Sequence, residues 1–528
     1  MFGSASLLGA VSTVTWISVP MLIAFFGLMI SVGFACRKQA KSVDSFVLGG
    51  RSVGPWLTAF AFGTSYFSAV IFVGYAGQFG WNFGLASTWI GLGNAFIGSL
   101  LAWIVLGRRT RLMTQHLGSK TMPDFFERRY DSKTLKIVAS VIVFVFLIPY
   151  TASLYNGLSS LFNNVFSLPY WAVVLIMAGL TGVYVIFGGY MATAINDFIQ
   201  GIIMLVGIVT VIAAVLMKNG GFTAAVESLR QSEYAGAEYV SLFGPDPTFL
   251  FFVVILTSLG TWGLPQMVGK FYSIKDEGSI KKGTVISTVF AIVVAGGCYF
   301  LGGFGKLYFH PMNENGYIKE SGVLFDKVVP TMLSDLAPVI VALIIVLVLS
   351  ASMSTLSSLV LTSSSTLTLD VIRPAMEKKK EVGEKKSVFI LRLFIVFFIA
   401  VSAAIAILKD SVWSDSVFIA QMMGVSWGAL AGAFLAPFLY GLYWKKTTKA
   451  AVAASFAFGV GLELVQLCIG IGWFSVEGIP VLDFVFKNSL YSGVFAMIGG
   501  LILVPIVSLL TQKTLPSNLD EKFSGYRK

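Results

Sequence analysis

The residues best suited to chemistry lie in the stretch SASMSTLSSLVLTSSSTLT, residues 350–368, where 12 of 19 side chains carry a hydroxyl. The stretch continues an apolar run and is therefore expected in a helix at membrane depth. A bilayer has no water to satisfy hydroxyls, so they must face protein, a cavity or an ion. Residues at i, i+3, i+4, i+7 and i+11 share one helical face, here Ala351, Ser354, Thr355, Ser358 and Thr362. Hydroxyl and carbonyl oxygens suit a small hard cation such as Na⁺, although small residues could instead serve close helix packing.

The composition predicts the environment of that helix. The chain has 528 residues, 56% hydrophobic and 12% charged, with a mean hydropathy of +0.83. A soluble protein would carry about 25% charged residues, so we predict a polytopic helical membrane protein. The first 13 residues hold no Lys or Arg, which argues against a signal peptide. Scattered cysteines (Cys36, Cys298 and Cys468) and loop histidines (His116 and His310) predict no disulfide framework, zinc site or haem site, which leaves Na⁺ as the only expected metal.

Apolar segments recur along the whole chain. We expect thirteen transmembrane helices, near 14–36, 56–76, 83–107, 137–163, 170–187, 191–217, 248–269, 283–305, 336–368, 388–408, 415–442, 450–473 and 488–511. With the N-terminus outside, the inside segments hold 30 of the 37 Lys and Arg, and the outside loops hold seven against twelve Asp and Glu. The positive-inside rule therefore predicts an outside N-terminus and a cytoplasmic C-terminus. It also explains the net charge of +11 without a nucleic-acid partner.

Two segments carry residues that weaken a helix. The second has Gly63-Thr64-Ser65 at its centre, and the seventh has Gly260, Gly263 and Pro265. These segments are five helices apart and enter from opposite sides, as expected for two inverted five-helix repeats that each start with a discontinuous helix. Unwound backbone would free carbonyls for a cation and N–H groups for an anionic substrate group.

Two acidic residues fall inside predicted spans. Asp197 lies in the first turns of the sixth segment, and Glu463 lies in the middle of the twelfth. A carboxylate at membrane depth is costly and suggests function. We therefore expect Asp197 to bind a cation or to serve a gate, with a helix-terminal or interfacial role as the alternative. Glu463 lies outside both repeats and is a weaker candidate.

Four pieces of the sequence resemble the sodium:solute symporter family: FVLGGRSVGPWLTAFAFGTSYFSAVIFVGYAG, VYVIFGGYMATAINDFIQ, GLPQMVGKFYSIKD and SASMSTLSSLVLTSSSTLTLD. The resemblance covers nearly the whole chain and implies Na⁺-driven uptake through one LeuT-type transmembrane domain, residues 1–528. Its expected parts are an extra N-terminal helix (14–36), a first repeat (56–217), an inverted second repeat (248–442), two C-terminal helices (450–511) and a cytoplasmic tail (512–528). The expected location is a bacterial cytoplasmic membrane.

The resemblance also implies site residues by motif position. The main sodium site of the family matches the carbonyls of Thr64, Phe67 and Ala351 and the hydroxyls of Ser354 and Thr355. A second sodium site, held by some members, matches Asp197, Ser357 and Ser358. The Arg of the family's G-G-R-S segment, which serves coupling in the proline carrier, matches Arg51.

The solute-binding residues follow less directly. Expected pocket residues are Ser65, Tyr66, Ser68, Tyr150, Thr261, Trp262, Gln266 and Gln421. Tyr150 matches a substrate-lining Tyr of the proline carrier. However, Tyr66 replaces that carrier's Asp, and Thr257 and Thr261 stand where it has Trp and Tyr, so proline is in doubt. The pattern around Tyr66 resembles the pantothenate branch more closely.

The leading hypothesis is a Na⁺-coupled importer of a small organic solute, a carboxylate or an amino-acid-like compound of pantothenate or proline type. A sodium-coupled sugar or sialic acid carrier is the alternative within the family. A channel would need a continuous polar pore, whereas the polar groups here cluster at two breaks and one helix. A kinase-linked sensor would need an attached domain, and an intramembrane enzyme would need a His/Asp or metal constellation. The expected partners are therefore the solute, Na⁺ and the lipid bilayer.

Overall fold

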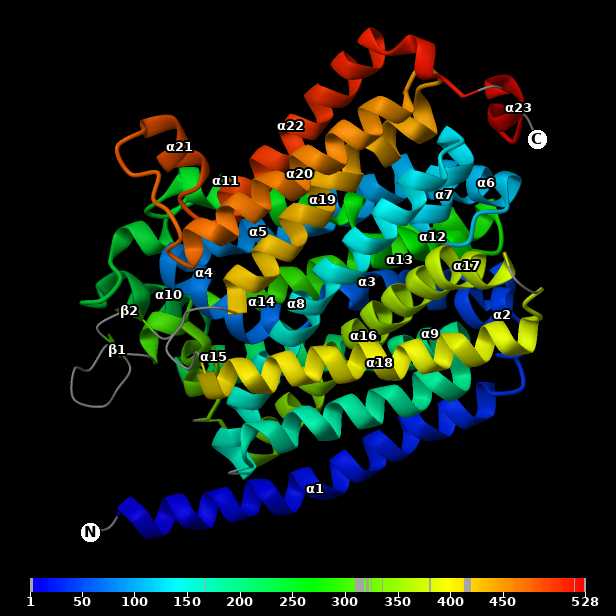
Figure 1. Cartoon of the computed structure of the whole chain (residues 1–528). Helices are drawn as coiled ribbons and strands as arrows, with labels where there is room; N and C mark the ends of the chain where they lie inside the picture. Colours follow the sequence, from blue (N-terminus) through cyan, green and yellow to red (C-terminus); the bar gives the residue numbers. More distant parts are fainter. Residues whose placement is uncertain are drawn as a thin grey trace.

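A computed structural model of the chain describes residues 3–166, 168–308, 318–319, 322–323, 325–334, 336–378, 381–412, 419–516 and 518–526. In these ranges the only strands are β1 (Ile318–Lys319) and β2 (Gly322–Val323), a short antiparallel pair. All other regular structure is helical, which confirms the predicted all-α class. In Figure 1, α1 lies along one edge of the bundle and α22 along the opposite edge.

The α-helices are α1 (Gly3–Cys36), α2 (Val43–Leu48), α3 (Pro55–Tyr66), α4 (Ala76–Phe83), α5 (Thr88–Gly93), α6 (Arg108–Leu117), α7 (Met122–Tyr130), α8 (Lys133–Phe166), α9 (Tyr170–Lys218), α10 (Phe222–Gln231), α11 (Pro247–Leu259), α12 (Pro265–Ser273), α13 (Glu277–Ala291), α14 (Gly297–Gly302), α15 (Phe325–Ser334), α16 (Pro338–Thr366), α17 (Arg373–Glu377), α18 (Glu384–Val412), α19 (Ile419–Tyr443), α20 (Lys449–Gly470), α21 (Pro480–Val485), α22 (Ser489–Leu510) and α23 (Leu519–Ser524). Tighter 3₁₀ turns are η1 (Gly49–Arg51), η3 (Gly84–Ser87), η6 (Ala237–Val240), η7 (Gly260–Gly263), η9 (Gly305–Leu307) and η11 (Gln512–Thr514). Wider π turns are η2 (Val70–Tyr75), η4 (Asn94–Leu101), η5 (Trp103–Gly107), η8 (Ile292–Gly296) and η10 (Leu367–Ile372).

Ten of the described helical stretches are long and apolar enough to cross a membrane, or eleven when the bent pair Pro247–Gly263 and Pro265–Ser273 counts as one span. Two of the ten, Val70–Leu117 and Tyr170–Lys218, have 48 and 49 residues, whereas one crossing needs about 20. Each contains a glycine with a positive φ, Gly84 at 59° and Gly189 at 55°. The polytopic helical class is thus confirmed, and the count of thirteen helices stays a prediction.

Helix α9 folds back on itself at Gly189. The backbone of Tyr184, before this glycine, packs against Gly33 of α1, and the amide of Asn196, after it, donates to the Met29 carbonyl of α1 at 3.3 Å. In a straight helix Tyr184 and Asn196 would lie roughly 18 Å apart along the axis, but their partners on α1 are only one turn apart. The two arms of α9 therefore lie side by side along α1, as two neighbouring crossings would.

Both predicted discontinuous helices are present. Helix α3 ends at Tyr66, Phe67 is extended (φ −81°, ψ 114°), and regular winding resumes at Val70. We expected the break at Gly63-Thr64-Ser65, and it lies just after these residues. Gly63 itself stays helical and lies close to the ring of Phe290. In the second discontinuous helix, α11 and η7 meet α12 at Leu264, which is extended, and the two parts are bent by 46°. The helix is interrupted here because Pro265 has no backbone N–H to donate the hydrogen bond that would continue it.

The segments predicted to lie inside the cell gather at one end of the bundle, which we call the basic end. Figure 1 shows α2, α6, α7, α17 and α23 there, and α10, α15, β1, β2 and α21 at the opposite end. Ion pairs connect the segments of the basic end: Lys120 with Asp44 at 2.8 Å, and Lys445 with Asp520 at 2.6 Å. The start of α1 and helix α23 lie at opposite ends, as an odd number of crossings requires.

The first prediction concerns orientation. Cysteine is introduced at exposed Gly383, on the basic end, or at exposed Glu477, in the loop before α21, in a chain whose native cysteines are replaced. On intact cells, a membrane-impermeant thiol reagent should label position 477 and spare position 383, because Lys and Arg are retained in the cytoplasm. Lysed cells, in which both positions should react, provide the control. Labelling of 383 but not 477 in intact cells would reverse the orientation.

Candidate functional site

Several serines and threonines of α16 bond their hydroxyls to backbone carbonyls of the same helix. Ser354 and Thr355 donate to the Ala351 carbonyl at 3.0 and 3.1 Å, and Ser357 donates to the Ser354 carbonyl at 2.9 Å. Such back-bonding satisfies hydroxyls in a dry environment and holds their oxygens at fixed positions. All of these side chains are buried. The predicted hydroxyl face therefore lies inside the bundle.

The residues expected at the main sodium site come together where α16 meets the break of α3. The Thr355 hydroxyl lies 3.1 Å from the Thr64 carbonyl oxygen and 3.2 Å from that of Phe67. The Ser354 hydroxyl lies 3.2 Å from the Thr64 carbonyl oxygen. With the Ala351 carbonyl, this gives three carbonyl and two hydroxyl oxygens in one buried cluster.

The break of α3 explains why these carbonyls are accessible. In a regular helix the amide of Ile71 would donate to the Phe67 carbonyl, but here it donates to Ser68 at 3.0 Å. The Phe67 carbonyl receives the Thr355 hydroxyl instead. An all-oxygen donor set without sulfur or nitrogen is the chemistry that suits a hard cation such as Na⁺. The residues present therefore fit the ion that the sequence predicts.

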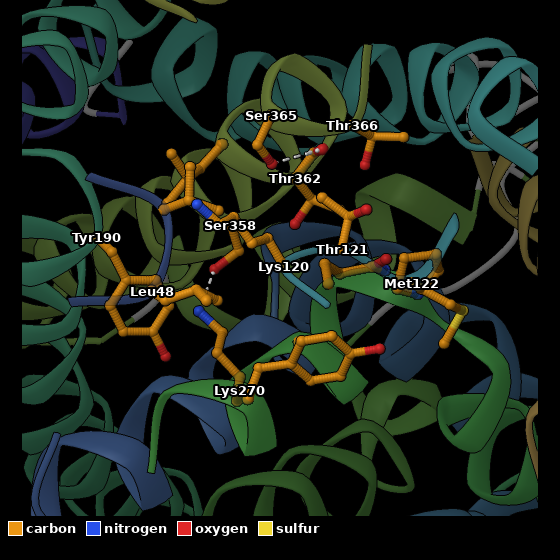
Figure 2. A pocket seen from close by; sticks show the side chains of 16 residues that line it. Leu48, Lys120, Thr121, Met122, Tyr190, Lys270, Ser358, Thr362, Ser365 and Thr366 are labelled. Atoms are coloured by element: carbon orange, nitrogen blue, oxygen red, sulfur yellow. Dashed lines mark hydrogen bonds between the residues drawn. The ribbon is translucent and has the colours of Figure 1, made fainter. Parts of the chain in front are cut away.

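The residues expected at the second sodium site are brought together only in part, and a lysine lies among them. Lys270 Nζ of α12 lies 3.7 Å from Asp197 Oδ2. It also donates to the Ser358 hydroxyl at 2.9 Å (Figure 2). Ser358 also exchanges a hydrogen bond of 2.8 Å with Ser65, one of the expected pocket residues. The Ser357 hydroxyl is bonded to its own helix, as described above.

Sequence reasoning missed Lys270 at this site because it falls in residues 270–282, which were counted as an inside loop. One signal could have found it. Pro265 starts a helix, and a lysine five residues later, within the apolar run MVGKFY, lies in that helix and not in a loop. The side chain of Lys270 is only 5% exposed, which a lysine tolerates only with a partner.

A partly open cavity, which we call the vestibule, lies between the basic end and this lysine. Figure 2 shows Lys270 and Ser358 beside Tyr190 on one side, and Thr362, Ser365 and Thr366 of α16 along its wall. The expected pocket residue Gln266 also lines the vestibule, and its side-chain amide has no hydrogen-bond partner in the described part of the chain.

A second cavity, which we call the central cavity, lies between the two breaks. Tyr66 and Thr261, which we expected to bind the solute, both line it, together with Asn94 of η4. The Asn94 amide donates to the Tyr66 hydroxyl, and its carbonyl oxygen accepts from Ser258 at 3.1 Å. Asn94 was missed, although an amide in the middle of an apolar span is itself a signal.

Trp427 of α19 contacts two of the aromatic residues near the main ion cluster. The rings of Tyr150 and Trp427 are 6.0 Å apart. Tyr66 packs on the same Trp427 at 5.6 Å. The Tyr150 hydroxyl, the Ser68 hydroxyl and the Trp427 ring nitrogen have no hydrogen-bond partner in the described residues. Buried orphan groups of this kind are what a bound polar solute would satisfy.

The remaining expected residues are spread out. The Trp262 ring nitrogen donates to the Ile97 carbonyl at 3.0 Å, so its polar atom is already used. The backbone of Gln421 belongs to α19, and its side chain lies outside the described residues. Glu463 is fully buried against Gly428, among α19, α20 and α22, where its carboxylate has no hydrogen bond to the described residues. The contacts of Glu463 are thus with the C-terminal helices.

Arg51 connects segments of the basic end around the vestibule. Its guanidinium donates to the carbonyls of Ser119 at 2.5 Å and Tyr272 at 3.3 Å, and Lys120 and Tyr272 are both part of the vestibule wall. Burial lowers the pKa of Arg51, and the carboxylate of Asp44 opposes that shift. A guanidinium nevertheless stays charged in proteins. We therefore predict that Arg51 acts as a clamp at the mouth of the vestibule on the basic end.

Comparison with known proteins identifies the family. Residues 46–459 match the model of the Sodium:solute symporter family, and the chain belongs to that family. Sodium/proline symporters of Staphylococcus aureus strains JH9 and COL are 29% identical over 514 residues, which cover 94% of this chain and 93% of each relative. The prediction made from the four sequence pieces is therefore confirmed: the chain is a Na⁺-coupled solute symporter and not an enzyme.

Solved structures confirm the fold. The substrate-bound, outward-open structure of a Na⁺-coupled sialic acid symporter superposes with a TM-score of 0.72 at 17% identity and covers 94% of this chain and 97% of that chain. The closed, bromovinylhydantoin-bound structure of Mhp1, a nucleobase-cation-symport-1 family transporter, gives a TM-score of 0.50 at 13% identity over 91% of this chain and 98% of that one. The chain therefore has the predicted LeuT-like fold.

The second prediction concerns the Arg51 clamp. Replacing Arg51 by Ala removes charge-assisted hydrogen bonds worth about 1.5–3 kcal/mol, so the mouth of the vestibule on the basic end should open more often by roughly tenfold. A cysteine at Thr362, on the vestibule wall, should then react faster with a thiol reagent in inverted membrane vesicles. Arg111→Ala is the matched control, since Arg111 also donates to backbone carbonyls at the basic end, those of Ile274 and Lys275. Equal labelling rates in both variants would remove the clamp role.

Proposed function

We propose that the chain imports a small organic solute together with Na⁺ by alternating access, with the ion held by Thr64, Phe67, Ala351, Ser354 and Thr355. One observation carries the proposal: the hydroxyls of Ser354 and Thr355 meet the carbonyls of the α3 break at 3.1–3.2 Å. No charged group is needed among the ligands, because a Na⁺ ion brings the charge and the oxygens replace its hydration shell.

The position of this cluster suggests how ion and solute are coupled. Tyr66, which lines the central cavity, lies in the chain between the two α3 residues whose carbonyls join the cluster, Thr64 and Phe67. A bound ion would fix that stretch of backbone and thereby the wall of the cavity. Ion binding would then prepare the solute site, and the solute would in turn favour the ion, as reciprocal coupling requires.

The driving force follows from the ion's charge. Moving one positive charge inward through 100 mV contributes about 2.3 kcal/mol, in addition to the concentration gradient of Na⁺. We place the protein in the plasma membrane, here a bacterial cytoplasmic membrane. The chain crosses it thirteen times, with the N-terminus outside and the C-terminus in the cytoplasm. The gathering of basic segments at one end and the location of α1's start and α23 at opposite ends support this topology.

The groups around the central cavity restrict the solute class. None of its described lining residues is charged. An aromatic hydroxyl, an amide and the helix breaks are present instead, so a carboxylate on the solute would be held by backbone N–H groups at the breaks. A carboxylate or amino-acid-like solute of pantothenate or proline type fits this environment. A sugar or sialic acid is the second candidate, supported by the similarity to the sialic acid symporter.

The third prediction tests the ion site. Thr355→Val keeps the side-chain shape and removes one oxygen of the cluster. It should raise the Na⁺ concentration that gives half-maximal thermal stabilisation of the purified protein by about tenfold, equivalent to roughly 1.4 kcal/mol. Ser364→Ala is the control, because Ser364 is buried in the same helix, nine residues beyond Thr355 and therefore on the opposite face. An unchanged Na⁺ dependence of Thr355→Val would contradict the assignment.

The fourth prediction identifies the solute and its site. Thermal stability of the purified protein is measured with a panel of carboxylates, amino acids, sugars and sialic acid, with Na⁺ or K⁺ present. A true solute should stabilise the protein more in Na⁺ than in K⁺, because ion and solute bind cooperatively. Thr261→Trp should fill the central cavity and abolish solute stabilisation while Na⁺ stabilisation remains. A solute that stabilises this variant as well as the wild type must bind elsewhere.

A further inference from the structure

We infer that the ammonium group of Lys270 is the resident cation of the second cation site, so that this carrier binds one Na⁺ where relatives with a free second site bind two. The inference rests on the proposed function, since it presupposes the Na⁺ site at the α3 break. It differs from the expectation drawn from the family resemblance, in which Asp197, Ser357 and Ser358 would hold a second sodium ion.

The geometry around Asp197 supports this. Both carboxylate oxygens are buried without a hydrogen bond to the described residues, and the ion pair with Lys270 Nζ at 3.7 Å is the charge partner. The Asp197 side chain is 0% exposed and that of Lys270 5%. Lys270 Nζ also donates to the Ser358 hydroxyl at 2.9 Å. The ammonium therefore contacts two of the three residues that were expected to hold the ion, and it carries the same unit charge as Na⁺.

The surroundings of the lysine complete a cation environment. The ring of Tyr190 faces Lys270 Nζ with its centroid 5.4 Å away, at cation–π distance. Ser65 of α3 extends the network through its bond to Ser358. Figure 2 shows the lysine reaching from α12 toward Ser358 of α16, with Tyr190 alongside. An aromatic face, a carboxylate and a hydroxyl thus converge on one ammonium group.

Electrostatics argues against a sodium ion in addition to this lysine. An ion bound to Asp197 and Ser358 would lie within about 4 Å of the ammonium nitrogen. At an effective dielectric constant near 20, repulsion between two unit charges at that distance weakens binding by roughly a thousandfold. The carboxylate cannot satisfy both cations in so small a space. Lysine and sodium are therefore alternatives at this site.

The consequence for transport is that the second cation remains covalently attached to the protein. Lys270 belongs to the inner half of the second broken helix, Asp197 to the second arm of α9, and Ser358 to α16. The ammonium holds these three elements together as a bound ion would. It carries no Na⁺ across the membrane, so the Na⁺-to-solute ratio is one lower than with an open second site.

The test counts ions and needs no solute. Equilibrium binding of radioactive sodium is measured on the purified full-length wild type, on Lys270→Met, and on the double variant Asp197→Asn/Lys270→Met. We expect one ion per wild-type chain, two for Lys270→Met, whose Asp197 then lacks a cation, and one for the double variant. Lys270→Arg, which keeps the charge, should bind one. Glu463→Gln, which changes a buried carboxylate elsewhere, should also bind one.

Each outcome has one meaning. Two ions on the wild type, or one ion on a folded Lys270→Met, would overturn the role of Lys270 and leave the main ion site standing. No Na⁺ on the wild type would overturn the proposed function itself. If Lys270→Met does not fold, Lys270→Gln purified in high Na⁺ replaces it. If that variant also fails, the wild-type count decides, because a second ion bound in the presence of Lys270 contradicts the inference directly.

Discussion

The architecture depends on one constraint: backbone carbonyls released by a helix break must find partners where no water is available. At the break of α3, the hydroxyls of Ser354 and Thr355 provide them. The same oxygens that satisfy the break in this structure are those that could surround Na⁺. The break of α3 therefore depends on the hydroxyls of α16, and the ion site depends on both.

The second break likewise brings together groups that need each other. Pro265 ends the backbone continuity of the seventh predicted segment and starts α12, which brings Lys270 under the vestibule and beside Asp197. Without that lysine, Asp197 would be a buried charge with no counter-ion, a state that costs several kcal/mol. Arg51 acts on the same region from outside the membrane-spanning part by binding the Tyr272 carbonyl at the end of α12. Both cations thus position α12, the half of one broken helix that follows Pro265.

The helical class and the grouping of the basic segments were predictable from the sequence. Hydropathy predicted the helical class, because apolar side chains favour lipid over water. The distribution of Lys and Arg predicted the grouping, because these charged residues stay on one side of the membrane. Helical periodicity placed Ser354 and Thr355 on one face. The partners of Asp197 were not predictable in the same way, since Lys270 is far from it in sequence and only the fold of α12 brings them together. The exact position of the first break was not predictable either, because the chain becomes extended at Phe67, whose carbonyl accepts a hydrogen bond from the distant Thr355.

The ammonium of Lys270, which stays attached to the protein, limits the ratio of inside to outside solute that a cell can reach. For an uncharged or zwitterionic solute, one Na⁺ moving through a tenfold gradient and 100 mV provides about 3.7 kcal/mol, enough for roughly 500-fold accumulation at equilibrium. A second sodium ion would square that ratio, to roughly 250,000-fold. A lysine in place of an ion thus suits a carrier for a solute that is neither extremely dilute outside nor needed at extreme excess inside, at half the sodium entry per molecule.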